Sequence, residues 1–196
     1  MKIPMMKLGG GGFIAWLVGA VLLIVAWFSG ARPGIYDLSF KVGDTATAVL
    51  GTGLVIEAIG MILVGVGCFG MWKEYRNVEH KTALPSATGA VGIVAGVVSM
   101  VTGISFISGQ TIAIMFILTL IASLIVASFM LLLGLSMFLL QERMGKGMAM
   151  PAGIMSLIAA CSYLYGLSTI ALVLVPTTVL CMIAFFNAKA TGSESE

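Results

Sequence analysis

The stretch that decides the fold is ATAVLGTGLVIEAIGMILVGVGCFGMW, residues 46–72. It is apolar almost throughout and carries a single charged side chain, Glu57, near its middle. A bilayer-spanning helix needs about 20 mostly apolar residues, and this run is long enough. An acid within such a helix is costly in lipid, so Glu57 is expected to be buried against a neighbouring helix.

Small residues recur along this stretch at an interval of seven, at Ala46, Gly53, Gly60 and Gly67. On an α-helix that spacing drifts by only about 20° per repeat, so the four residues lie on one side. Glu57 comes four residues after Gly53 and three before Gly60, which places it on the same side. The pattern predicts that the face carrying the acid is also the face of closest helix packing.

The composition of the whole chain agrees with a membrane protein. The 196 residues are 60% hydrophobic and only 9% charged, whereas soluble domains carry about 25% charged residues. The mean hydropathy is +1.14, and a soluble chain of this size has too little interior for so much apolar surface. The net charge of +2 comes without a basic patch interleaved with aromatics, which argues against nucleic-acid binding. We therefore expect an all-α, polytopic transmembrane helical bundle.

Apolar runs separated by polar links predict six spans in a single transmembrane domain. They are expected at about residues 13–30, 46–72, 86–107, 111–140, 151–165 and 169–186, followed by a disordered tail at 187–196. The number falls to five if the first run is a cleaved signal peptide or the last pair is re-entrant. The final turn is expected at Gly166–Ser168, and Pro176 is expected to kink the last span.

The distribution of positive charge predicts the orientation. With six spans, both termini lie on the same side of the membrane. Eight of the ten Lys and Arg residues fall on that side, and Arg32 and Lys41 fall on the other. The eight are Lys2, Lys7, Lys73, Arg76, Lys81, Arg143, Lys146 and Lys189. Positive residues are retained on the cytoplasmic side, so both termini are predicted to be cytoplasmic.

A second stripe of small residues runs along the third predicted span. Gly89, Gly92, Gly96, Ser99 and Gly103 are spaced by 3, 4, 3 and 4 residues, which forms a continuous line on a helix. In lipid, helices associate through close backbone approach at such residues. We expect spans two and three to form an antiparallel hairpin with their glycine stripes facing each other. The glycines are expected to allow tight helix packing and not to line a pore.

The depth of each residue in the membrane, counted from the outer ends of these two spans, suggests a hydrogen-bond partner for Glu57. Ser99 lies at a similar depth, and Thr102 lies one turn nearer the surface. No predicted span contains Lys, Arg or His, so a charged Glu57 has no counter-ion. We therefore expect the Glu57 carboxyl to be neutral and to donate one hydrogen bond to a hydroxyl or a carbonyl oxygen.

Other reactive side chains suggest no cofactor or metal site. The chain has 14 methionines, and Met148 and Met150, two residues apart, are the clearest candidate pair for binding Cu(I). Flexible packing of membrane cores is the favoured role for these methionines. His80 is expected to be a solvated loop residue. The three cysteines are expected to be small apolar fillers, and they are Cys68, Cys161 and Cys181.

No catalytic motif is present in the sequence, and we expect a protein that is not an enzyme. The favoured function is a structural or accessory subunit of a membrane assembly, in contact with lipid and with other membrane subunits or copies of itself. The alternative is a small proton- or cation-coupled transporter or channel that uses Glu57.

Overall fold

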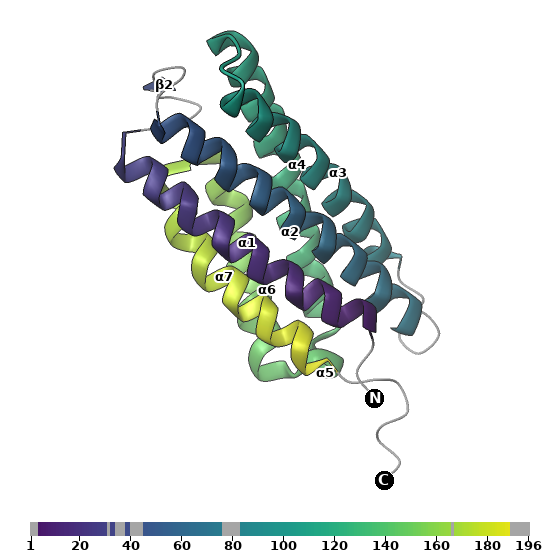
Figure 1. The fold of residues 1–196 in the computed structure, drawn as a ribbon. Helices are drawn as coiled ribbons and strands as arrows, with labels where there is room; N and C mark the ends of the chain where they lie inside the picture. The colour runs from purple at the N-terminus through teal and green to yellow at the C-terminus, as the bar shows by residue number, and fades with distance from the viewer. Residues whose placement is uncertain are drawn as a thin grey trace.

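The computed structural model describes residues 4–30, 32–33, 38–39, 45–75, 83–165 and 167–188. In this part of the chain the helices are α1 (Pro4–Phe28), α2 (Thr45–Tyr75), α3 (Leu84–Ile107), α4 (Ile112–Leu139), α5 (Gln141–Met144), α6 (Lys146–Tyr165) and α7 (Leu167–Asn187). Two short strands, β1 (Arg32–Pro33) and β2 (Leu38–Ser39), pair antiparallel between α1 and α2. Figure 1 shows the helical bundle that the sequence predicts, so the all-α fold class is confirmed.

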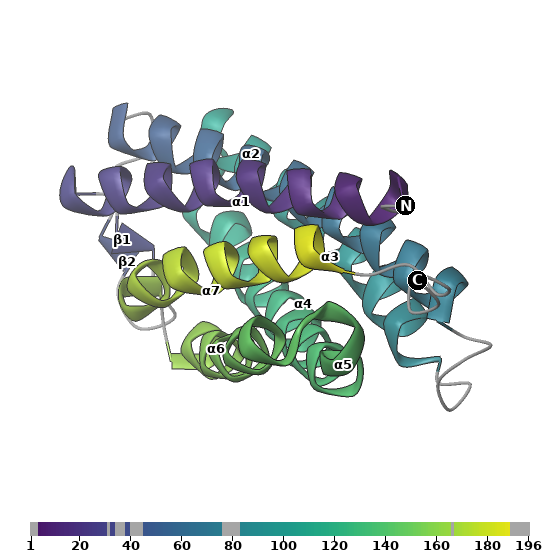
Figure 2. The same ribbon diagram turned by 90° about the horizontal axis from the view of Figure 1, so that it is seen from below.

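The six longer helices form a closed ring in chain order. Each packs against the next, α1 on α2, α2 on α3, α3 on α4, α4 on α6 and α6 on α7, and α7 returns to α1. In Figure 2, α1 and α2 form one side of the bundle and α6 the opposite side, with α7 between α1 and α6. Every long helix therefore has one face towards a common interior.

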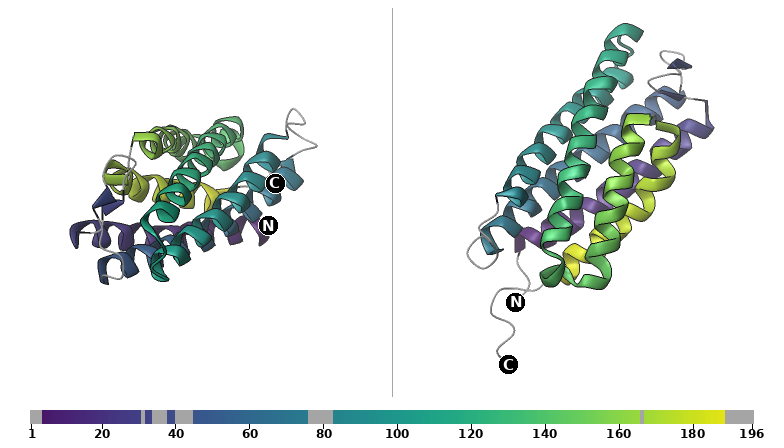
Figure 3. Two further views of the ribbon diagram at one scale, coloured as in Figure 1. Left: turned by 90° about the horizontal axis from the view of Figure 1, so that it is seen from above. Right: turned by 180° about the vertical axis from the view of Figure 1, so that it is seen from behind.

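The bundle has two distinct ends. Pro4 of α1 and Asn187 of α7 lie at the same end, which we call the termini end (Figure 1). The opposite end holds β1, β2 and the turn from α3 to α4, and we call it the hairpin end. Figure 3 shows α6 and α7 side by side along the bundle.

The outer surface of the bundle is apolar. Large aliphatic side chains are half exposed on the outside of neighbouring helices, for example Val97 at 50%, Ile104 at 52% and Ile117 at 55%. Helices α1, α2, α3 and α4 are long and apolar enough to cross a membrane, and shorter apolar helical stretches cover residues 147–163 and 173–187. The protein is a membrane helical bundle, and the number of crossings stays a prediction.

Several helix boundaries differ from the sequence-based expectation. Helix α1 begins at Pro4, so Gly9–Gly12 lie inside the helix instead of before it. Pro151, the first residue of the fifth predicted span, lies within α6, which begins at Lys146. Helix α7 begins at Leu167, and Gly166 lies outside the described residues, as do His80 and most of the predicted tail, residues 189–196.

The glycine stripe that carries Glu57 packs on α1, which corrects the predicted pairing with α3. A Cβ atom at Gly60 would lie 2.6 Å from the Trp16 backbone nitrogen, and one at Gly67 would lie 2.6 Å from the Gly9 Cα. A Cβ at Gly53 would lie 3.2 Å from the carbonyl oxygen of Gly19. The close approach seen in the sequence is real, but the partner is the preceding helix.

Helix α3 contacts α2 through a second series of small residues on α2, also seven apart. Added Cβ atoms at Gly51 and Gly65 would meet the carbonyl oxygens of Gly103 and Gly89 at 2.6 and 2.8 Å. Between these pairs, a Cβ at Gly96 would lie 2.7 Å from the Ala58 carbonyl oxygen. The α3 stripe therefore meets α2 as predicted, except that Gly92 faces the Phe129 ring of α4. Small residues on two faces let α2 pack tightly against both neighbours.

Candidate functional site

Glu57 lies inside the ring of helices and links three of them. Its side chain is 1% exposed. The carboxyl oxygen Oε1 accepts a hydrogen bond from the indole Nε1 of Trp16 on α1, and another from the Tyr163 hydroxyl on α6 at 2.9 Å. Because α6 is not a ring neighbour of α2, the second bond crosses the interior of the bundle. Burial of Glu57 within the protein is confirmed.

The absence of a side chain at Gly19 brings Trp16 to this position. A Cβ at Gly19 would lie 2.7 Å from the Glu57 backbone nitrogen, so α1 and α2 are in backbone contact at the level of the acid. Trp16 comes three residues before Gly19 and therefore projects from the adjacent turn on a neighbouring face. Its N–H group, which must find an acceptor when buried, reaches the carboxyl.

The predicted partners of Glu57 lie nearby but do not bond to it. Ser99 and Thr102 line the same pocket as Glu57, yet the Thr102 hydroxyl donates to the Val98 carbonyl of its own helix at 2.8 Å. Only residues of the third predicted span were expected as partners of Glu57. Trp16 and Tyr163 were not predicted from the sequence as partners of Glu57. Both are aromatic residues with a hydrogen-bond donor inside an apolar run, and a buried donor of this kind needs an acceptor.

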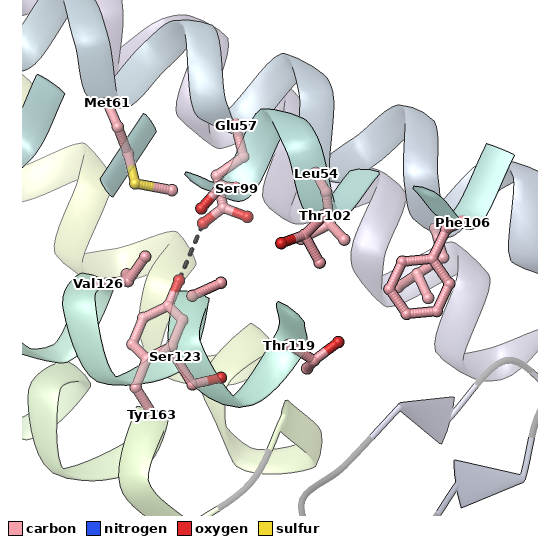
Figure 4. Close-up of a pocket in the computed structure, with 12 residues that line it drawn as sticks. Leu54, Glu57, Met61, Ser99, Thr102, Phe106, Thr119, Ser123, Val126 and Tyr163 are labelled. Carbon is pink, nitrogen blue, oxygen red and sulfur yellow. Dashed lines mark hydrogen bonds between the residues drawn. The ribbon is translucent and has the colours of Figure 1, made fainter. Parts of the chain in front are cut away.

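A small pocket lies beside the carboxyl, between α2, α3, α4 and α6 (Figure 4). Its lining consists of Leu50, Leu54, Glu57, Met61, Ser99, Thr102, Phe106, Thr119, Ala122, Ser123, Val126 and Tyr163. The centres of water-sized spheres can occupy about 30 Å³ within it. A single water needs about 10–15 Å³ on this measure, so the volume of the pocket corresponds to one or two water molecules.

Two serine hydroxyls in this pocket are left without a protein partner. Ser99 and Ser123 are 2% and 7% exposed, and neither hydroxyl makes a hydrogen bond to any described residue. The neighbouring Thr102 and Thr119 instead bond the carbonyls of Val98 and Met115 in their own helices. Among described residues, no fully enclosed side-chain nitrogen or oxygen lacks a partner. The two serine oxygens therefore open onto the pocket.

Aromatic rings close the interior on the other side of Glu57. The Trp16 ring stacks between Phe13 and Phe129, with centroid distances of 5.9 and 5.7 Å and interplanar angles of 6° and 17°. Phe185 of α7 packs edge-on against Phe13 at 5.1 Å. Along their helices these rings lie towards the termini end, whereas the pocket extends past Leu50 and Phe106 towards the hairpin end. The carboxyl thus lies between the stacked aromatic rings and this pocket.

The other candidate ligands do not gather into a site. In the described ranges, no group of three or more His, Cys, Asp or Glu side chains could hold a metal ion. Met148 and Met150 are 39% and 50% exposed at the start of α6. Cys181 is buried with its sulfur 3.5 Å from the Ser156 hydroxyl oxygen, and Cys161 is exposed. The pocket at Glu57 is therefore the candidate functional site.

No protein-family model matches the chain, and neither a curated protein nor a solved structure shows significant similarity to it. The chemistry open to the site follows from its geometry. A buried carboxyl beside a small internal pocket of a membrane bundle is a candidate for binding and releasing a proton or a small cation.

Proposed function

We propose that the protein is a small proton- or cation-coupled membrane transporter or channel, with Glu57 as the residue that binds the transported or coupling ion. One observation carries this proposal: the buried carboxyl lies beside a water-sized pocket in the interior of the helical ring. Transporters of known structure place their ion sites in the same way, between helices near the middle of the bilayer.

The two oxygens of the Glu57 carboxyl have different roles in this proposal. The indole N–H of Trp16 can only donate, so Oε1 has to accept that bond in every state of the carboxyl. The hydroxyl of Tyr163 also donates to Oε1 and further fixes its position. Oε2 makes no hydrogen bond to a described residue, so it is the oxygen available for a proton or a cation.

A structural subunit of a larger membrane assembly, which the sequence favours, is the second candidate. The supporting observation is that Glu57, Trp16 and Tyr163 join three helices of the ring by hydrogen bonds. In that case the carboxyl would only hold the helices together, and Gln at position 57 would replace it with little loss. The same substitution thus separates the two candidates.

Ion flux in proteoliposomes tests the proposal. Purified protein is reconstituted under an imposed proton or Na⁺ gradient, and flux is followed with a trapped pH-sensitive dye or with radioactive Na⁺. Glu57→Gln is expected to abolish flux, because the amide keeps the side-chain volume but neither ionises nor carries a charge. Glu74→Gln, at the termini end of the same helix, is the matched control and is expected to retain flux.

Equal flux through wild type and Glu57→Gln would overturn the proposed function. A protein that passes no ion by itself, and that purifies with stoichiometric partner subunits from the native membrane, would support the structural candidate instead.

A further inference from the structure

We infer that helices α6 and α7 are the moving part of the bundle, and that the hydrogen bond from Tyr163 to Glu57 is the latch that holds them closed at the hairpin end. When this bond breaks, the hairpin half of α6 moves away from α2 and uncovers the Glu57 carboxyl. The inference rests on the proposed function, because the carboxyl has to become accessible before it can exchange an ion.

The Glu57 carboxyl is enclosed in the structure. Its side chain is 1% exposed, and the pocket beside it has room for only about one or two water molecules. The walls of this pocket are formed by α2, α3, α4 and α6. Access from outside the bundle therefore requires that one of these helices moves.

Helices α1, α2 and α3 are held together by backbone contacts along much of their shared length. Added Cβ atoms at Gly19 and Gly67 would lie 2.7 and 2.6 Å from backbone atoms across the contact between α1 and α2. Those at Gly51 and Gly65 would lie 2.6 and 2.8 Å from backbone atoms across the contact between α2 and α3. Close backbone approach of this kind makes a strong helix contact in lipid.

Helix α4 is tied to α3 in both halves of the bundle. Towards the termini end, the Thr88 hydroxyl oxygen lies 2.8 Å from the Ser136 hydroxyl oxygen. Towards the hairpin end, the Thr102 hydroxyl lies 3.5 Å from the Leu118 carbonyl oxygen, and a short turn at residues 108–111 joins the two helices. Helices α1 to α4 therefore form one connected unit.

The close contacts that glycines make between this unit and α6 or α7 lie towards the termini end. A Cβ at Gly134 of α4 would lie 2.9 Å from the Gly153 carbonyl oxygen of α6, and a Cβ at Gly9 of α1 would lie 2.8 Å from the Phe185 ring of α7. No described glycine makes such a contact with α6 beyond Leu157 or with α7 before Phe185. The hairpin halves of both helices are thus packed less tightly on the unit.

Helices α6 and α7 are joined to each other and lie side by side (Figure 3). The Thr177 hydroxyl of α7 lies 3.3 Å from the Met155 carbonyl oxygen of α6, so the two helices can move together. Pro151 lies two residues before Gly153 and has no backbone N–H, so α6 lacks one helix hydrogen bond beside its contact with α4. We place the pivot of the movement at this contact.

The bond from Tyr163 to Glu57 closes the hairpin half. Tyr163 comes ten residues after Gly153, which places it about 15 Å from the pivot along α6. Its hydroxyl donates to the Glu57 carboxyl at 2.9 Å (Figure 4). The other side-chain hydrogen bonds of the described residues of α6 and α7 stay within this pair of helices. A single bond far from the pivot is the arrangement expected of a latch.

Distances between two spin labels, measured by pulsed electron paramagnetic resonance in lipid vesicles, test the latch. One label is attached to the native Cys161, which is exposed on α6 two residues before Tyr163. The other is attached to a Thr52→Cys variant, on the exposed side of α2. Cys68 and Cys181 are buried and are expected to stay unlabelled. Because this pair of labels spans the bundle, opening of α6 lengthens the distance between them.

Tyr163→Phe removes the hydroxyl and keeps the ring. The ratio of the longer to the shorter distance is expected to rise about two- to twelvefold, which is the effect of losing one ordinary hydrogen bond. Glu57→Leu removes the acceptor of the same bond and is expected to give a similar rise, so it serves as the test if Tyr163→Phe does not fold. Glu57→Gln retains an acceptor oxygen and is expected to keep the wild-type distances.

Trp16→Phe is the matched control. It removes the other donor to the same carboxyl oxygen, but α1 stays packed on α2 through its glycines, so the distance between the labels is expected to stay unchanged. A second pair of labels, at Lys73 of α2 and Met150 of α6 with Cys161 replaced by serine, reports on the termini end. This pair is expected to show the same distance in wild type and in Tyr163→Phe.

The outcomes separate this inference from the proposed function. Equal distance distributions in wild type, Tyr163→Phe and Glu57→Leu would disprove the latch, and equal lengthening at the termini end would disprove the pivot. If the distances stay unchanged but Glu57→Gln abolishes flux, the proposed function holds without this movement. If the distances lengthen as expected but Glu57→Gln retains flux, the latch stands and the proposed function fails.

Discussion

Trp16 and Glu57, 41 residues apart in the sequence, are joined by a buried hydrogen bond from the indole N–H to the carboxyl oxygen. The bond exists because glycines at positions 19 and 60 bring the backbones of α1 and α2 into contact on either side of it. The indole is also held between two phenylalanine rings. Trp16 therefore fixes the orientation of the carboxyl and closes one side of the interior.

Trp16→Phe is expected to lower stability while preserving the aromatic stack. The phenyl ring can still pack between Phe13 and Phe129, but the buried carboxyl loses one of its two donors. Loss of a partner from a buried polar group costs about 1–3 kcal/mol. The measurement is thermal or denaturant unfolding in detergent. Unchanged stability of Trp16→Phe would show that the bond to Glu57 contributes nothing.

Tyr163→Phe is expected to act on the same carboxyl from α6. The Tyr163 hydroxyl is buried and donates to Glu57 at 2.9 Å, so the substitution removes a bond and leaves the ring in place. A double-mutant cycle with Glu57→Leu, which removes the acceptor oxygens, is expected to give a coupling of about 0.5–3 kcal/mol, as for other residues in direct contact. Additive effects of the two substitutions would contradict the contact.

The burial of Glu57 was predictable from the sequence, but its partners were not. One acid in a long apolar run has to face protein, because lipid offers it no hydrogen bond. The run itself does not tell which neighbour it faces, since lipid-facing and core-facing side chains of a membrane helix are equally apolar. Tyr163 is 106 residues away and reaches Glu57 only because α6 closes the ring opposite α2.

The two series of small residues on α2 also show that the sequence predicts a packing face but not the helix that it contacts. The series at 53, 60 and 67 and the series at 51, 58 and 65 both repeat every seven residues, and both predict close packing. The order of helices around the ring decides that the first meets α1 and the second meets α3. The spacing of small residues predicts that a helix has a packing face. Which helix packs on that face depends on contacts between residues far apart in the sequence.

Gly60→Ala is expected to destabilise the bundle, whereas Gly11→Ala is not. A Cβ at Gly60 would lie 2.6 Å from the backbone nitrogen of Trp16, so α1 would have to move away from α2. Overpacking of this kind costs about 1–3 kcal/mol. A Cβ at Gly11 meets nothing within 4 Å, and alanine there is expected to stabilise α1 by about 0.5–1 kcal/mol. Melting temperatures of both variants test the prediction, and a stable Gly60→Ala protein would contradict the close contact.

The pocket at Glu57 is expected to be reached from the hairpin end of the bundle. Its lining continues from the carboxyl past Leu54 and Thr102 towards that end, and the stack around Trp16 blocks the termini end. Cysteine introduced at Thr119, in a protein whose native cysteines Cys161 and Cys181 are replaced, is expected to react with a small membrane-impermeant thiol reagent added on the hairpin side. The same reagent on the termini side is expected to react far more slowly.

The remaining native thiol, Cys68, is the internal control for this labelling. It is fully buried on α2, eleven residues beyond Glu57 towards the termini end, and it is expected to stay unmodified from both sides. Rapid labelling from the termini side would show that the aromatic stack does not seal the bundle, and the assignment of the entry side would be wrong.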